Sequence, residues 1–168
     1  MTGDVLDTPR GQGYASGSSW SRGQAWAIYG FTLSYIHTGN QEYLEVAKRV
    51  AHYFIANLSE DGVPVIDFRA PEEPVFKDTT AGAIALCGLI EIAKHVSPME
   101  KALYETAAEK ILKGLERNCD FTLNNQSILR NGSESYHAPN GHHIPIIYGD
   151  YYLMEALLKL KGNDILFW

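Results

Sequence analysis

The sequence has few of the features that mark nucleic-acid-binding or membrane proteins. Its 20 aspartates and glutamates outnumber its 14 lysines and arginines, so the formal net charge is -6 with neutral histidines. It has no run of basic residues, and we predict no nucleic-acid partner, because nucleic acid binds a concentrated basic patch. It also has no apolar run as long as a membrane-spanning helix, so we predict no membrane partner.

Cysteine is scarce as well. Cys87 and Cys119 lie far apart, match no metal-ligand spacing and are too few for a disulfide framework. We interpret both as small buried apolar residues, a role that fits a cytoplasmic and a periplasmic protein equally well. The first residues, MTGDVLDTPRGQG, have no apolar core of the signal-peptide kind. The localisation therefore stays open.

What the sequence does contain is helical periodicity. The 168 residues, 45% of them hydrophobic, suffice for one domain with a core, which we assign to 1–168, with an irregular N-terminal segment at 1–18. The segments 41–57 and 98–117 are amphipathic, with one apolar and one charged face. The second of them follows Ser97, the expected N-cap of a capping box.

Three further segments are apolar on nearly all sides, which is typical of helices that are buried on most faces. They span 22–38, 79–95 and 150–161. Asp78 and Asp150 are the expected N-caps of the second and third segments. Gly39 and Gly162 are the expected stops of the first and third.

The spacing of these segments indicates a repeat. The apolar helices begin near residues 22 and 79, and the amphipathic ones near 41 and 98, so both pairs are offset by 57 residues. The chain thus repeats a hairpin of one inner and one outer helix, and a third inner helix follows. Such hairpins stack into a curved array or close into a toroid. All inner helices then point their N-termini at one rim, which suits anionic ligands.

The segments 62–69 and 127–149 each precede an inner helix and contain no helical pattern. They are therefore predicted to cover the same rim, where loops on a rigid scaffold carry binding residues. The stretch SSWSRGQAW begins the first inner helix at this rim. Arg22 and Trp26 are four residues apart and share a helix face, and Trp20 lies just before them.

Two interpretations of this stretch follow from the residues alone. Arginine binds a carboxylate through two parallel hydrogen bonds, and tryptophan offers an apolar plate, so together they would suit a ring that bears a carboxylate. In the alternative, Trp20 and Trp26 anchor the core and Arg22 pairs with a nearby aspartate. Asp78 is a weak candidate for a catalytic acid and fits a helix cap better.

The loop with Tyr136 also holds His137, His142 and His143, but this spacing is not that of a zinc site. We predict a polar loop that faces a ligand and holds no metal. Neither a nucleophile elbow nor a phosphate-binding glycine loop is present.

Three stretches, in order, resemble the second half of glycoside hydrolase family 88, the unsaturated glucuronyl hydrolases. They are QGY followed by SSWSRGQAWAIYGF, then KDTTAGAIA, and finally IPIIYGDYYLMEALLKL, and the resemblance covers about 12–161. A sister family, the unsaturated rhamnogalacturonyl hydrolases, is similar but usually has Asn-Gly where this chain has Gln24 and Ala25, which favours family 88.

The resemblance implies an all-α (α/α)6 toroid of twelve helices, of which this chain would supply about five to six. It implies hydration of the C4=C5 bond of a 4,5-unsaturated uronyl residue at the end of an oligosaccharide, with an aspartate as general acid and base and no metal or organic cofactor. By resemblance, Gln12, Trp20, Arg22, Trp26 and Tyr136 match substrate-binding positions. With it, the sugar-acid interpretation of Arg22 is favoured.

One departure from the family pattern changes the prediction. The two key aspartates of the family precede the QGY segment, and no counterpart of either is found here, so no catalytic residue is assigned. We expect the chain to be a C-terminal portion, inactive alone, that dimerises through its exposed edges or is poorly stable. A non-catalytic carbohydrate-binding or assembly module is the alternative from another functional class, and an unsaturated rhamnogalacturonyl hydrolase is the alternative enzyme.

Overall fold

The computed structural model describes residues 9–163 and 166. Within this part of the chain, the regular elements are five helices, and the only strand-like features are isolated β-bridges. The helices are α1 (Ser21–Thr38), α2 (Gln41–Ala56), α3 (Thr79–Lys94), α4 (Pro98–Glu116) and α5 (Ile147–Leu160). The all-α prediction is confirmed, and the five predicted helices all exist.

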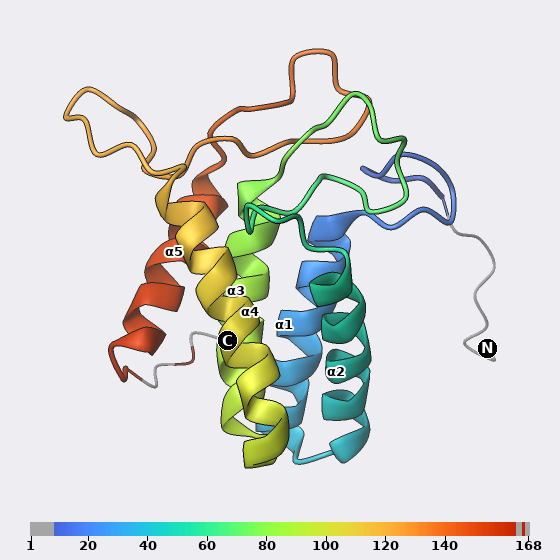
Figure 1. Cartoon of the computed structure of the whole chain (residues 1–168), viewed down its shortest axis with the longest axis vertical. Coiled ribbons are helices and arrows are strands. Elements are labelled where there is room, and N and C mark those ends of the chain that lie inside the picture. Colours follow the sequence, from blue (N-terminus) through green and yellow to red (C-terminus); the bar gives the residue numbers. More distant parts are fainter. Residues whose placement is uncertain (1–8, 164–165, 167–168) are drawn as a thin grey trace.

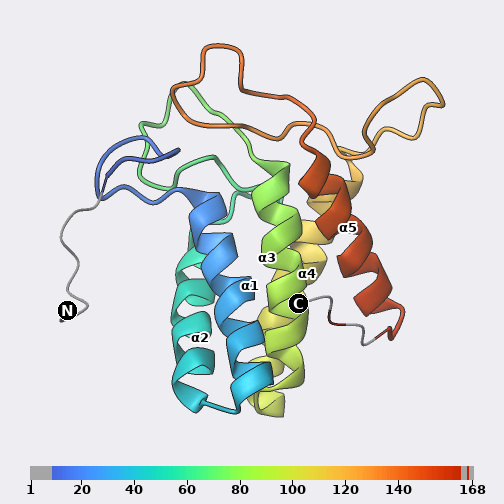
Figure 2. The same ribbon diagram turned by 180° about the vertical axis from the view of Figure 1, so that it is seen from behind.

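The helices form two layers (Figures 1 and 2). Helices α1, α3 and α5 lie side by side and run in the same direction, and α2 and α4 return antiparallel on one side of them. Within the inner layer, α3 contacts α1 and α5, while α2 packs on α1 and α4 packs on α3. The predicted repeat of inner and outer helices is therefore present, and the N-termini of the inner helices meet at one end.

Most of the predicted helix ends are confirmed. Ser97 accepts a hydrogen bond from the Glu100 N–H, and Asp78 accepts one from the Thr80 N–H, so both residues are N-caps. Gly39 ends α1 in the left-handed conformation with φ of 69°, which costs glycine little. Gly162 follows α5 in the same conformation.

The N-cap assignment of Asp150 is wrong. Helix α5 begins at Ile147, so residues 147–149, predicted as loop, are helical and Asp150 lies inside the first turn. Its carboxylate instead accepts hydrogen bonds from Ser127 Oγ at 3.0 Å, Ile128 N at 3.1 Å and Leu129 N at 2.6 Å. The carboxylate thus fastens a loop that lies about twenty residues earlier, a partner that short-range capping rules do not consider.

Burial differs among the three inner helices. Every residue of α3 from Thr79 to Ala93 is buried, as predicted. Helix α3 lies between α1 and α5, so α1 and α5 each have an inner-layer neighbour on one side and an uncovered side opposite it. Several large apolar side chains of these two helices stay exposed, namely Trp26, Tyr151, Met154, Leu157, Leu158 and Leu160, and three of them, Met154, Leu157 and Leu160, border a groove between α4 and α5. The prediction of near-complete burial therefore holds for α3 and not for the two edge helices.

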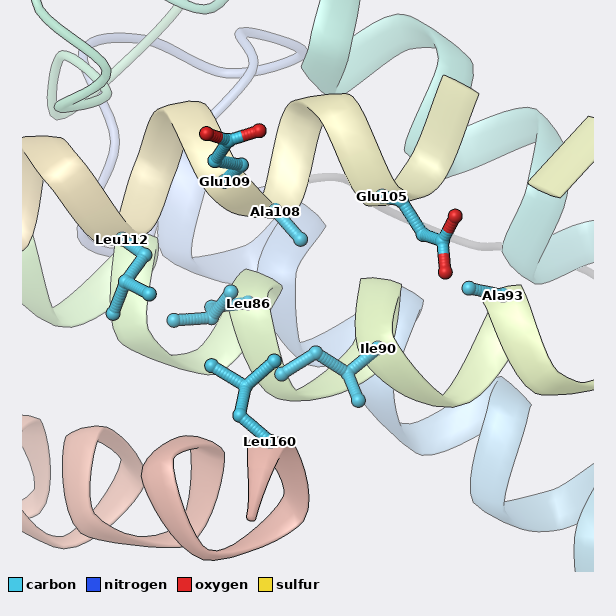
Figure 3. Close-up of a pocket in the computed structure, with 8 residues that line it drawn as sticks. All are labelled: Leu86, Ile90, Ala93, Glu105, Ala108, Glu109, Leu112 and Leu160. Atoms are coloured by element: carbon cyan, nitrogen blue, oxygen red, sulfur yellow. The ribbon is translucent and has the colours of Figure 1, made fainter. Parts of the chain in front are cut away.

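An apolar groove separates α4 from α5, with α3 as its floor (Figure 3). One part, of about 310 Å³, is lined mainly by apolar side chains of the three helices, among them Leu86, Ile90, Leu112 and Leu160. A second part of about 330 Å³ shares Leu112 and continues past Leu153 and Leu157. Two carboxylates, Glu105 and Glu109, border the first part.

The loops gather over the N-terminal ends of the inner helices, where the long segment before α5 crosses those before α1 and α3 (Figure 1). Backbone bridges join Trp20 to Asp67 and Gly132 to Ile144. Residues 9–19 form turns in this region, and the rest of the predicted irregular segment, 1–8, lies outside the described residues. Cys87 is buried and Cys119 is half-buried, and both are free thiols. In the described part, none of the helices could cross a membrane.

Candidate functional site

Arg22 is the centre of the rim beneath the loops. Its side chain is only 1% exposed, and its Nε donates to Asp78 Oδ2 at 2.9 Å. Its Nη1 donates to the Tyr148 hydroxyl at 2.7 Å, and its Nη2 donates to the carbonyl oxygens of Ser133 and Glu134. The hydrogen bonds thus engage all three nitrogens and tie α1 to α3, to α5 and to the loop before α5.

Asp78 lies on the other side of this ion pair and is completely buried. It accepts from Arg22, caps α3 through the Thr80 N–H and accepts from the Ser133 N–H at 3.4 Å. Burial raises the pKa of the Asp78 carboxyl, while the Arg22 guanidinium acts in the opposite direction. A raised pKa suits a general acid. The Asp78 carboxyl, however, has no exposed surface, and its hydrogen bonds make it the cap of α3 and the counter-ion of Arg22.

Trp20 contacts Arg22 directly, whereas Trp26 is linked to it through Tyr148. The Cζ atom of Arg22 lies 5.2 Å from the centre of the Trp20 ring and 5.7 Å from that of Tyr148, both within cation–π range. The buried indole Nε1 of Trp20 has no hydrogen-bond partner among the described residues. Trp26 is 36% exposed, with its ring centre 6.3 Å from Tyr148 and 5.3 Å from Tyr152. Trp26 therefore offers the accessible aromatic surface of the pair.

Gln12 and Tyr136 join the same cluster through the loop before α5. Gln12 Nε2 donates to the Glu134 carbonyl oxygen at 3.0 Å, the oxygen that Arg22 also reaches. The Tyr136 N–H donates to the Gln12 carbonyl oxygen at 2.9 Å, and its ring packs edge-on against Tyr14. The structure thus places the five sequence-predicted residues in one connected cluster, although Gln12 and Tyr136 meet Arg22 only through Glu134.

The three histidines do not converge on one point. His137 interacts with the Tyr14 carbonyl oxygen at 2.7 Å, whereas His142 interacts with the Tyr136 carbonyl oxygen and stacks on Phe76 at 3.6 Å. His143 has a positive φ of 55° and lines a separate polar hollow with Arg130. Across the described residues, no group of three metal-ligating side chains comes together.

Two features of the site escaped the sequence reasoning. Asp67 accepts from the N–H groups of Tyr14, Ser19 and Arg69 and from the Ser18 hydroxyl, so it orders the turns that lead into α1. Tyr148 accepts from Arg22 and stands beside Trp26. The partners of Asp67 before α1 lie at least 48 residues away in the sequence, and Arg22 lies 126 residues from Tyr148, so no local pattern marks either residue.

The chain matches no family model, but it is similar to several known proteins. It is 40% identical over 164 residues to an unsaturated glucuronyl hydrolase of Bacillus sp. (strain GL1), covering 94% of this chain and 43% of that protein. The chain is a partial-length relative of the unsaturated glucuronyl hydrolases. It spans less than half the length of the curated relatives it matches.

Two further relatives extend this assignment. An unsaturated chondroitin disaccharide hydrolase of Streptococcus pneumoniae is 34% identical over 173 residues, covering 99% of this chain and 43% of that protein. A solved unsaturated glucuronyl hydrolase variant of Streptococcus agalactiae, in complex with dGlcA-GalNAc6S, superposes with a TM-score of 0.87 at 34% identity. That match covers 99% of this chain and 46% of the solved one. The five helices thus correspond to about half of the helical toroid of these hydrolases.

Proposed function

We propose that the chain is part of a hydrolase that acts on unsaturated uronyl oligosaccharides and hydrates the C4=C5 bond of a terminal 4,5-unsaturated glucuronyl residue. One observation carries the proposal: Gln12, Trp20, Arg22, Trp26 and Tyr136 meet at the N-terminal ends of parallel inner helices, in a fold that superposes on such hydrolases. The aligned helix dipoles favour the carboxylate of the sugar, and Trp26 offers a flat apolar surface for its ring.

In this proposal the chain binds the saccharide and does not turn it over alone. Hydration of the double bond needs an acid that reaches the substrate. Three aspartates at this end, the buried Asp67 and Asp78 and the half-buried Asp150, each accept at least three hydrogen bonds within the fold. The general acid would then come from residues that the 43% coverage of the relatives leaves out. We therefore take 1–168 as one domain and a C-terminal portion of an (α/α)6 toroid.

The first prediction concerns binding. Titration calorimetry of the chain with a lyase-generated unsaturated uronyl disaccharide is expected to show saturable binding. Replacing the half-exposed indole, Trp26→Ala, is expected to weaken it about 5- to 30-fold, as loss of a ring-stacking surface worth about 1–2 kcal/mol would do. Phe31→Leu, on the part of α1 that stacks with Tyr43 of α2, serves as the matched control and should bind as the wild type does. Absence of any binding by the wild-type chain would refute the proposal.

A second prediction concerns self-association of the isolated chain. We propose that it self-associates through the exposed apolar sides of its edge helices, because apolar patches of this kind drive association. Sedimentation velocity is expected to show a monomer–dimer equilibrium that shifts with protein concentration. The double change Met154→Glu with Leu157→Glu, in the groove beside α5, should abolish the dimer. Met99→Glu, at an exposed methionine of α4 that does not line the groove, should leave it intact. A concentration-independent, folded monomer contradicts this proposal.

A further inference from the structure

The hydrogen bonds of Arg22 limit how it can reach a ligand. Its side chain is 1% exposed, and all three of its nitrogens already donate to groups within the fold. A direct bidentate contact with a ligand carboxylate would need two parallel N–H donors on one accessible edge of the guanidinium. The geometry provides no such edge, so the charge of Arg22 must act on a ligand through a neighbour.

Tyr148 is the neighbour with that capacity. Arginine has donors and no acceptor, so in the contact at 2.7 Å between Arg22 Nη1 and the Tyr148 hydroxyl the tyrosine oxygen is the acceptor. The phenolic hydrogen is then left to donate elsewhere, and the described residues offer it no acceptor. A hydroxyl that accepts from a cation becomes a stronger donor, because linked hydrogen bonds polarise one another.

The position of Tyr148 fits a ligand contact. It lies in the first turn of α5, where the unpaired N–H groups and the positive end of the helix dipole are found. Its side chain is half-buried, and its ring centre is 6.3 Å from that of Trp26, which is 36% exposed. An aromatic plate and a polarised hydroxyl therefore stand side by side at the rim.

We propose that Tyr148 donates its phenolic hydrogen to the carboxylate of the bound uronyl ring, and that Arg22 is a positioning residue that acts through Tyr148. This inference rests on the proposed function and adds a residue that determines specificity for an acidic sugar. A neutral sugar of the same shape lacks the charged acceptor, so Tyr148 should discriminate between the two.

Tyr148→Phe tests this assignment, since it removes the hydroxyl and keeps the ring beside Trp26. Calorimetric titration of the chain uses the unsaturated uronyl disaccharide and its reduced analogue, in which CH₂OH replaces the carboxylate. The variant is expected to bind the acidic ligand about 10- to 100-fold more weakly, the range for a hydrogen bond to a charged group, and the neutral analogue unchanged. Tyr43→Phe on α2, far from the rim, is the matched control and should bind both ligands normally.

The possible outcomes distinguish failure of the proposed function from failure of the Tyr148 assignment. If the wild type binds neither ligand, the proposed function and this assignment both fail. If the wild type binds the acidic ligand and Tyr148→Phe binds it equally well, or loses both ligands equally, only the assignment fails. If Tyr148→Phe does not fold, 3-fluorotyrosine is introduced at position 148 instead. Its hydroxyl is more acidic and a stronger donor, so at a pH where this hydroxyl stays protonated it should tighten binding of the acidic ligand and leave binding of the neutral analogue unchanged. Unchanged selectivity between the two ligands overturns the assignment.

Discussion

Replacing Arg22 by alanine is expected to lower the free energy of unfolding by about 3–5 kcal/mol, the usual cost of removing one partner from a buried ion pair. The change leaves the completely buried Asp78 carboxylate without its cation at 2.9 Å. It also leaves the carbonyl oxygens of Ser133 and Glu134 without the guanidinium that joins them to α1. Urea denaturation followed by circular dichroism measures this loss.

Two comparisons show whether the loss comes from the unpaired charge. Arg49→Ala, at an exposed arginine of α2, should change stability by less than about 0.5 kcal/mol. The double variant Arg22→Met with Asp78→Asn removes both charges while asparagine keeps the cap of α3, and it should recover much of the stability. A loss below about 1 kcal/mol in Arg22→Ala would show that the ion pair does not hold the rim together.

The second large loss of unfolding free energy is expected when Lys159 is replaced. This lysine lies in a buried polar cluster between the inner helices. Its side chain is 1% exposed, and its Nζ lies 2.7 Å from Glu91 Oε1 on α3 and 3.4 Å from Glu155 Oε1 on α5. The Tyr29 hydroxyl of α1 donates to the same Glu155 oxygen at 2.5 Å. Lys159→Met keeps the aliphatic volume but leaves the buried Glu155 carboxylate without its cation and Glu91 with only Lys94, whose Nζ lies 3.4 Å away, which should cost about 3–5 kcal/mol.

The control for this variant is Lys161→Met, at an exposed lysine just after α5, which should stay within about 0.5 kcal/mol of the wild type. Urea denaturation of both variants measures the difference. A loss below about 1 kcal/mol in Lys159→Met contradicts the assignment of Lys159 as the cation of this cluster.

The helices were predictable because they depend on local chemistry. Apolar spacing, the caps Ser97 and Asp78 and the stop at Gly39 act within a few residues, and all of them are confirmed. The repeat of the hairpin then indicated the common direction of the inner helices. Where the prediction was wrong, at Asp150, the carboxylate serves a loop more than twenty residues away, and the helix begins one turn earlier.

The polar network of the site could be predicted only in part. The sequence left two roles open for Arg22, a ligand contact or a pair with an aspartate, and the ion pair with Asp78 is present in the fold. That Tyr148 receives a hydrogen bond from Arg22 depends on a separation of 126 residues. The cluster of Glu91, Glu155 and Lys159 was hidden in helices that read as apolar, because each charge is satisfied only by tertiary neighbours.

The most direct test of the account follows the ultraviolet absorbance of the conjugated double bond while the purified chain is incubated with an unsaturated uronyl disaccharide that it binds. The account predicts that the ligand binds and the absorbance persists, because the rim holds a sugar acid but supplies no aspartate free to protonate it. Steady loss of the absorbance, abolished in a folded Asp78→Asn variant, would contradict this and make Asp78 the catalytic acid.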